Sequence, residues 1–494
     1  MKKRLKIFFI FIATAIVCFV ATFFGKEFII NYIESYKLSD IDIPDKDSKV
    51  LVFAPHSDDE VLGSGELIRA TLQNGGEVKV VLITNGDGSR STMELDYFNF
   101  NPKAMNYIDL GLRRQQESID ALKVLGLDEK NIIFLGYPDG GISRLWGSYW
   151  DHSTPYTSPF TKVDRSPYDN SFTPNAVYSG ESLIADMIRI INDYNPTHII
   201  YPHPNDRHPD HWAVNCFVKH VLAVLQYKPS YEWLYLVHRG DWPTPMKKNI
   251  NMYLVPPAKL SNTGTQWYGF MISYDDILNK STAIHCYKSQ LRTLRPLMTG
   301  FERKNELFGV YDNAQLAKSM RSDVDIEPDD GNRLIIDPLK DTLALEISKA
   351  ADISKIYGEI SGTKNLHVFI EAYANIDKKL QYNLGLFLYG SEKISRLDVE
   401  IKDGKASLKQ VSKQSITNGE GLIVNIEGKI IHIVIPHNIT GDYYHAFINA
   451  YTSKNSVLID KTAWRLLDNS AFIMLGTSDL PLLSAHPILL RKAS

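Results

Sequence analysis

The sequence predicts an α/β protein: a Rossmann-like, doubly wound and mostly parallel sheet, followed by a smaller all-β sandwich domain. Two observations support this fold class. Apolar runs of strand length alternate with helical periods over roughly the first 300 residues, and short alternating segments replace them from about residue 332. An uncharged run near the start adds an expected N-terminal transmembrane helix. With 494 residues, the chain is long enough for two or three domains.

The N-terminal segment has the features of a membrane anchor. Met1–Lys6 is basic, and Ile7–Gly25 contains no charged residue. A transmembrane helix needs roughly 20 apolar residues, and preceding basic residues favour a cytoplasmic N-terminus. We therefore expect residues 1–30 to form a single-pass anchor in the cell membrane, with the rest of the chain extracytoplasmic. Secretion after cleavage of a signal peptide is the alternative, and a buried helix of a soluble protein is a third.

The first domain is expected over residues 46–325, and it opens with two strands. Val50–Ala54 and Val78–Thr84 are almost continuous β-branched and aliphatic runs, which is typical of strands buried on both faces. Glu60–Gln73 between them has a helical pattern, and the following Asn-Gly-Gly ends it. This strand–helix–strand unit predicts parallel pairing.

The same alternation continues along the chain. Strand–helix alternation predicts a parallel sheet with helices on both of its faces. The predicted elements are helix Leu112–Leu125, strand Ile132–Leu135, helix Gly180–Tyr194, strand His198–Tyr201, helix Pro209–Leu225, strand Trp233–Val237 and a late helix Asp275–Gln290.

The second domain is expected over residues 332–475, after an acidic linker at Ser322–Asn332. Short alternating segments separated by turn residues predict an antiparallel sandwich. These segments are Leu366–Ala372, Tyr382–Leu388, Gly421–Ile426 and Ile430–Ile435. No catalytic pattern occurs in them, so this domain is expected either to bind carbohydrate or cell wall, or to act as a spacer or packing partner.

Composition excludes two classes of protein. The chain has 54 Lys+Arg against 57 Asp+Glu, so it lacks the basic excess of a nucleic-acid-binding protein. It has only three cysteines, one of them inside the apolar N-terminal run, which excludes a disulfide scaffold. We expect Cys216 and Cys286 to be buried thiols.

The first cluster of chemically active residues is His56-Ser57-Asp58-Asp59-Glu60, directly after the first buried strand. Ligands of open α/β sheets bind beyond the carboxyl ends of strands. Three carboxylates beside one imidazole would repel one another unless a cation is present. A plain helix N-terminus is the alternative; it explains residues 57–60, but it leaves His56 without a role.

A second cluster, His203–His211, follows the strand His198–Tyr201. Pro209 suits the first turn of a helix, which places His208 at its start and His211 within its first turn. A polar loop with surface histidines is the alternative. Two such clusters at the ends of two strands predict one metal site, in which a His and an Asp from the first cluster and a His from the second are the ligands. Catalytic zinc commonly has three protein ligands of this kind.

The two clusters and three further motifs resemble one known family. Ala54–Glu60 is similar to the (A/P)HPDDE signature of the PIG-L/LmbE-like zinc-dependent N-acetylglucosaminyl deacetylases, except that Ser57 replaces the usual proline. Asp206–His211 resembles their second motif, which ends HPDH. The supporting matches are Arg114–Glu117, Pro138–Gly140 and a late pattern of Lys280, Ala283 and Ser289-Gln290. The resemblance extends over roughly residues 46–300.

The resemblance implies a role for each matched residue. It implies zinc as the cofactor, with His56, Asp59 and His211 as ligands, and Asp58 as general base. His208 would stabilise the oxyanion or protonate the leaving amine, and Asp210 would orient a histidine. Arg114 and Asp139 would contact the substrate. The implied reaction removes N-acetyl groups from N-acetylhexosamine residues of a cell-surface glycan or glycoconjugate.

Two other functions remain open from the sequence. One is a catalytically silent protein that binds wall or glycan, and the other is a zinc amidase acting on another small amide. The segment Ile142–Tyr178 is rich in aromatic residues, which suit stacking on sugar rings. We interpret it as a glycan-binding rim, with a hydrophobic cover over the sheet edge as the alternative.

Overall fold

The computed structural model describes residues 26, 28–342, 348–390, 394–411, 416–417 and 421–468. The expected transmembrane segment, Ile7–Gly25, lies outside these residues, as does the end of the predicted second domain, 469–475. Among the residues that are described, none of the helices has the length and apolar character needed to cross a membrane.

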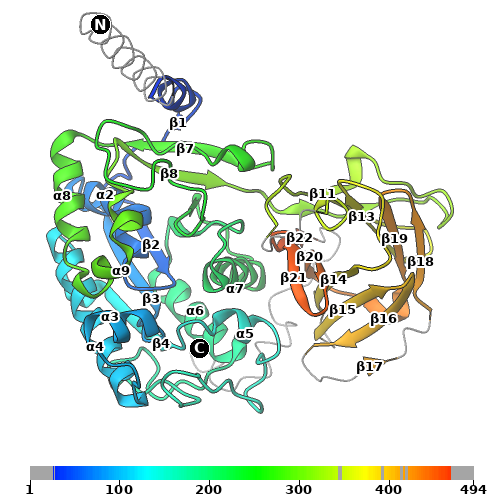
Figure 1. Ribbon diagram of the computed structural model, residues 1–494, viewed down its shortest axis with the longest axis horizontal. Coiled ribbons are helices and arrows are strands. Elements are labelled where there is room, and N and C mark those ends of the chain that lie inside the picture. Colours follow the sequence, from blue (N-terminus) through cyan, green and yellow to red (C-terminus); the bar gives the residue numbers. More distant parts are fainter. Residues whose placement is uncertain are drawn as a thin grey trace, which may run out of the picture.

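An eight-stranded sheet forms the first part of the molecule (Figure 1). Five of its strands are parallel and adjacent, in the order β4-β3-β2-β5-β6. Counted along the chain, this order is 3-2-1-4-5, which is that of a doubly wound sheet. These strands are β2 (Lys49–Ala54), β3 (Glu77–Thr84), β4 (Ile132–Tyr137), β5 (His198–Pro202) and β6 (Tyr231–Tyr235). The predicted parallel sheet is confirmed.

Three further strands extend the sheet beyond β6. β8 (Asn305–Val310) is antiparallel to β6, β7 (Gln266–Met271) is antiparallel to β8, and β1 (Ser39–Asp40) pairs parallel with β7. The sheet is therefore mixed, with its parallel part in the centre and at the β4 edge.

Helices cover both faces because alternate strand residues point to opposite sides. Val50 and Val52 of β2 belong to one apolar cluster with α2 (Asp59–Gln73) and α4 (Ala104–Val124). Leu51 and Phe53 belong to a second cluster with α6 (Gly180–Tyr194) and α7 (Pro209–Leu225). The predicted bounds of α6 and α7 are confirmed.

Two helix predictions were wrong in their bounds. The single late helix expected at Asp275–Gln290 is two helices, α8 (Tyr274–Ile284) and α9 (Lys288–Thr299). The chain turns between them because Tyr287 leaves helical geometry, with φ −79° and ψ 62°, and donates a hydrogen bond to Glu60. α4 begins at Ala104 instead of Leu112, because the side chain of Asn106 accepts from the backbone N–H of Lys103 and caps an earlier turn.

The second part of the molecule is rich in β-structure and consists of two sheets. One has the order β10-β12-β13-β19-β18, with β11 also paired to β12. Its strands are β10 (Ala317–Lys318), β11 (Arg333–Ile336), β12 (Ile353–Ile360), β13 (Leu366–Ala372), β18 (Ile423–Glu427) and β19 (Ile430–Ile435).

The other sheet has the order β17-β16-β15-β14-β20-β22-β9, with β21 paired to β20. Its strands are β9 (Ala314–Gln315), β14 (Gln381–Tyr389), β15 (Ile394–Lys402), β16 (Lys405–Gln410), β17 (Ile416–Thr417), β20 (His445–Lys454), β21 (Val457–Lys461) and β22 (Arg465–Asp468). Side chains of both sheets share one apolar cluster, so the two pack as a sandwich. β9 and β10 are strands of these two sheets, so the sandwich includes residues that precede the expected linker.

The aromatic segment Ile142–Tyr178 packs mainly inside the molecule. Trp146, Trp150, Tyr168 and Tyr178 are each at most 2% exposed. The glycan-rim interpretation is therefore wrong for these four residues, which form part of a hydrophobic cover instead. Trp146, which ends α5 (Ile142–Trp146), and Trp150 belong to the same apolar cluster as residues of β14 and β20, so this cover joins the two parts of the protein.

Candidate metal centre and active site

The two clusters of polar residues meet at the carboxyl ends of β2 and β5. These strands are adjacent and parallel, and the strand order of the sheet reverses between them. The loop after β2 carries His56–Asp59 into α2, and the loop after β5 carries His203–His208 into α7. Such a switch point is where open α/β sheets bind their ligands.

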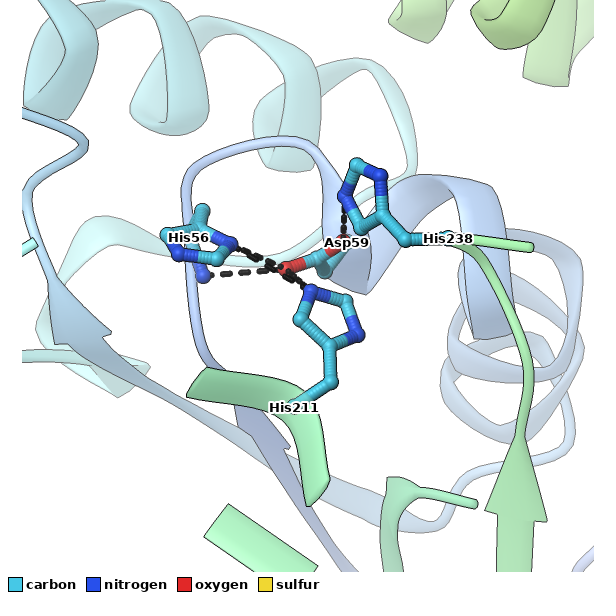
Figure 2. A group of neighbouring side chains, drawn as sticks. All are labelled: His56, Asp59, His211 and His238. Carbon is cyan, nitrogen blue, oxygen red and sulfur yellow. Dashed lines mark hydrogen bonds and ion pairs between the residues drawn. The ribbon is translucent and has the colours of Figure 1, made fainter. Parts of the chain in front are cut away.

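Three predicted metal ligands face one another there (Figure 2). Asp59 Oδ2 lies 3.2 Å from His56 Nδ1 and 3.0 Å from His211 Nε2, and the two nitrogens are 3.3 Å apart. Two ligands at a tetrahedral angle around zinc, with bonds of about 2.0–2.1 Å, are separated by about 3.3 Å. The second oxygen of Asp59 is buried and forms no hydrogen bond. The donor set therefore fits a divalent metal ion.

Asp206 holds His211 in this orientation. Its Oδ2 lies 3.1 Å from His211 Nδ1 and accepts the backbone N–H groups of Val237 and His238. Burial lowers the pKa of His211, but Asp206 and Asp59 outweigh it and raise that pKa to about 9. A carboxylate on the far nitrogen is the usual partner of a metal-bound histidine. We predicted the motif containing Asp206 but not this role.

His238 is a fourth residue at the site, and it was missed in the sequence. It follows β6, and its Nε2 is 3.8 Å from Asp59 Oδ1 (Figure 2). Burial lowers its pKa to about 3, so its imidazole is neutral. The signal that found the other histidines, a polar residue directly after a buried strand, also applies to His238.

Asp58 lies in the turn between His56 and α2. Its backbone has φ 120°, a conformation that non-glycine residues rarely adopt. Gln290 of α9 donates to Asp58 Oδ2 at 2.7 Å and to the carbonyl of Ser57 at 2.6 Å. Burial, followed by the charges of Asp59 and Glu60, raises the pKa of Asp58 well above its usual value. The turn between α8 and α9 thus brings Gln290 to the predicted base.

Asp210 and His208 lie on the α7 side of the site. Asp210 accepts the N–H groups of Gly140 and Ile142, and its Oδ2 is 3.2 Å from His56 Nε2. His208 Nδ1 accepts the backbone N–H of Asp210. Burial, followed by positive charge on His56 and His211, lowers the pKa of His208 to about 4. His208 is therefore neutral, with its ring proton on Nε2.

Asp139 lies at the site itself, whereas Arg114 lies behind it. Asp139 Oδ1 lies 3.3 Å from His56 Nε2, and its Oδ2 accepts the N–H of Gly88. Arg114 is 5% exposed and donates to Gly86, Thr92 and Ser289. Asp139 thus belongs to the site, whereas the guanidinium of Arg114 ties together the chain segments behind it.

Comparisons with solved structures give weak overall likenesses. The conserved protein TT1542 from Thermus thermophilus is 18% identical, over 51% of this chain and 84% of its own, with a TM-score of 0.30. N,N'-diacetylchitobiose deacetylase from Pyrococcus horikoshii is 19% identical, over 56% and 83%, with a TM-score of 0.32. A deacetylase of the teicoplanin biosynthesis pathway is 18% identical, over 53% and 97%, with a TM-score of 0.34.

A sequence comparison with curated proteins gave no match. The comparison with protein families did: residues 51–222 match the PIG-L family, described as GlcNAc-PI de-N-acetylase. This range contains the three predicted metal ligands that face one another, as well as Asp58 and His208. Residues 51–222 of this chain are a PIG-L family domain.

Proposed function

We propose that this protein is a zinc-dependent N-deacetylase that removes N-acetyl groups from GlcNAc-type residues of a cell-surface glycan or glycoconjugate. The observation that carries the proposal is the triangle of His56, Asp59 and His211 inside a PIG-L domain. Two imidazole nitrogens and one carboxylate oxygen are a donor set typical of catalytic zinc. Zinc bound there would polarise the amide carbonyl and acidify a water molecule.

Asp58 is the proposed general base. Gln290 holds its Oδ2, which leaves Oδ1 to take a proton from the attacking water. His208 is the proposed partner on the other side of the amide. Its Nδ1 is occupied by the N–H of Asp210, so Nε2–H is available to donate a hydrogen bond to the developing oxyanion, while the proton that Asp58 takes from the water would pass to the leaving amine.

Three further residues complete the proposed site. Asp210 would position His56 through Nε2 of the histidine. Asp139 would contact the same nitrogen, and one of its carboxylate oxygens would also accept a hydroxyl of the substrate. For Arg114 we propose an indirect substrate contact, through the loop containing Gly86 that it binds.

The proposed location follows from the N-terminal sequence. The basic residues before Ile7–Gly25 favour a single-pass anchor with the catalytic domain outside the cytoplasm. Secretion after signal cleavage is the alternative, and comparing the N-terminal residue of the mature protein with Met1 would separate the two.

The test is acetate release by the full-length, detergent-purified protein from a panel of N-acetylated saccharides. Asp58→Asn should lower kcat by about 10²–10⁴-fold while leaving bound zinc unchanged, because asparagine tolerates the positive φ but cannot accept the proton. The exposed Asp128→Asn is the matched control and should behave as the wild type.

Each alternative has its own result. A silent binding protein would retain glycan affinity without acetate release from any saccharide, even with zinc bound. A zinc amidase of another class would hydrolyse small non-sugar amides instead. A wild-type protein that binds no zinc would contradict the whole proposal.

A further inference from the structure

A second group of acidic residues lies far from the catalytic triangle in the sequence. Asp337 follows β11, Asp341 lies four residues later, and Asp460 belongs to β21. One carboxylate oxygen from each lies within 4.8 Å of the others. The three residues are 1%, 9% and 1% exposed, so this is a buried cluster and not an acidic surface patch.

Several oxygens of this cluster have no partner. Both carboxylate oxygens of Asp337 and one of Asp341 are buried without a hydrogen bond. A fourth carboxylate, Asp352, is 3% exposed; its Oδ2 accepts the N–H of Lys340, but its Oδ1 is also unpartnered. Buried carboxylates are normally paired or bound to a metal ion.

Arg239, Arg207 and Lys259 lie close enough to act on Asp341 through their charge, but none of them forms an ion pair with it. Arg207 donates to the backbone carbonyl of Asp341, and Arg239 forms its ion pair with Asp241. Within the described part of the chain, no Lys or Arg forms an ion pair with any of the four carboxylates. Burial, together with their mutual repulsion, raises the pKa of Asp460 to about 8. A divalent cation would relieve this repulsion.

We propose that Asp337, Asp341 and Asp460 bind a Ca²⁺ ion, with Asp352 as the fourth carboxylate. Ligands on opposite sides of a Ca²⁺ ion with bonds of about 2.3–2.6 Å lie about 4.6–5.2 Å apart, which accommodates the observed spacing. The donor set contains only oxygen, whereas zinc prefers nitrogen and sulfur. Mg²⁺ usually keeps several waters and binds through one or two carboxylates, so a buried group of four favours the larger ion.

The position of this site gives it a structural role. The side chain of Arg207, the residue before His208, donates a hydrogen bond to the backbone carbonyl of Asp341. The backbone N–H of Arg207 donates to the carbonyl of His238. A cavity of 60 Å³, lined in part by Asn205, Arg207 and Asp341, separates this segment from the end of β21. Ca²⁺ would therefore fix the sandwich against the loop that carries catalytic residues.

The experiment uses full-length protein saturated with zinc, stripped of Ca²⁺, and titrated with Ca²⁺ from about 1 μM to about 10 mM, which covers sensor and extracellular affinities. Calorimetry should show one bound Ca²⁺ per chain, and saturation should raise the Tm by roughly 5–10 °C. Tb³⁺ should replace Ca²⁺ and luminesce on tyrosine excitation, because the Tyr373 hydroxyl lies 2.8 Å from the carbonyl of Asp337.

The variants separate binding from folding. Asp337→Asn and Asp460→Asn should each weaken Ca²⁺ binding at least ~10-fold and abolish the Tm rise, yet melt no lower than the wild type without Ca²⁺, because one repelling charge is gone. Asp403→Asn, in an exposed turn of the same sandwich, should keep the wild-type response. If Asp337→Asn does not fold, Asp341→Asn, the most exposed of the three, gives the same readout.

Three results would overturn the proposal: no Ca²⁺ bound by the wild type at the highest concentration, equal binding by Asp337→Asn, or a Tm rise that Mg²⁺ reproduces at lower concentration. Because bound Ca²⁺ is measured without any substrate, a failure here is distinguishable from a failure of the proposed deacetylase activity.

Discussion

At the scale of single residues, Asp206 has a role in the candidate site that the sequence did not predict. Its carboxylate connects His211 Nδ1 to the backbone after β6, so it sets the direction in which His211 Nε2 points. The side chain is fully buried with the histidine. The geometry of the proposed metal site thus depends on a residue that is not itself a proposed ligand.

Replacing this carboxylate tests that dependence. Asp206→Asn keeps an acceptor for the backbone N–H groups but removes the charge opposite His211, so zinc affinity should fall about 10–100-fold. Competition with a chromophoric chelator measures this affinity. Excess zinc should restore most of the activity, which would not happen if Asp206 acted as a catalytic acid or base.

The exposed Asp193→Asn is the matched control for this variant. Unchanged zinc affinity in Asp206→Asn would mean that His211 is held by its other contacts.

At the scale of elements, the packing of α2 on the sheet depends on the absence of a side chain at Gly63. A Cβ atom at Gly63 would lie 2.6 Å from Cγ of Tyr235 on β6. Tyr235 cannot move aside easily, because it is fully buried and its hydroxyl donates to the carbonyl of Phe53 on β2. Gly63 therefore allows the helix that begins at the candidate metal site to lie close to the parallel strands.

Alanine at this position should be destabilising. Gly63→Ala gains up to about 1 kcal/mol of helix propensity but forces Tyr235 to shift. Overpacking of this kind costs about 1–3 kcal/mol, so we expect a net loss of free energy of unfolding. The control is in the same helix: at Gly65 the nearest atoms to a Cβ are 3.4 Å away, so Gly65→Ala should be neutral or stabilising. Thermal unfolding of both variants checks this, and equal Tm values would contradict it.

At the scale of the whole molecule, the two parts of the protein share a buried interface of aromatic and basic side chains. Arg396 of β15 lies 4.0 Å from the ring centroid of Trp150 and 4.1 Å from that of Phe387. Beside it, His445 Nε2 lies 2.9 Å from Nδ1 of His220 on α7, and both rings contact Tyr389. Because these groups are buried between the parts, their protonation is linked to the integrity of the interface.

This interface should weaken in acid. Burial lowers the pKa of His445 to about 3, and burial with the charges of His445 and Arg396 holds the pKa of His220 well below its usual value. An unfolded histidine has a pKa of about 6.5. Above that pH both states are neutral and stability is complete. As the pH falls below 6.5, the unfolded state gains protons that the folded state does not, so stability decreases. For His445 alone the loss is about 2 kcal/mol at pH 5.

Calorimetric unfolding between pH 7.5 and pH 5 measures this loss. His445→Gln keeps a polar partner for His220 but does not titrate, so its stability should fall less over the same range, by about 2 kcal/mol. His285→Gln, at an exposed position outside the interface, is the control. An identical pH dependence in His445→Gln and the wild type would show that the pair does not contribute.

Much of this protein was determined by local sequence. The bounds of α6 and α7, the parallel strands and the meeting of His56, Asp59 and His211 could all be predicted, because buried strands and helix caps have short-range signatures and parallel strands bring their carboxyl ends to one edge. Tertiary structure alone decided the rest. The break at Tyr287, the role of Asp206 and the burial of Trp146 and Trp150 each depend on a partner distant in sequence. The grouping of Asp337 with Asp460 does so across more than one hundred residues. Such pairs leave no periodicity or spacing in the chain, since only packing brings their atoms together.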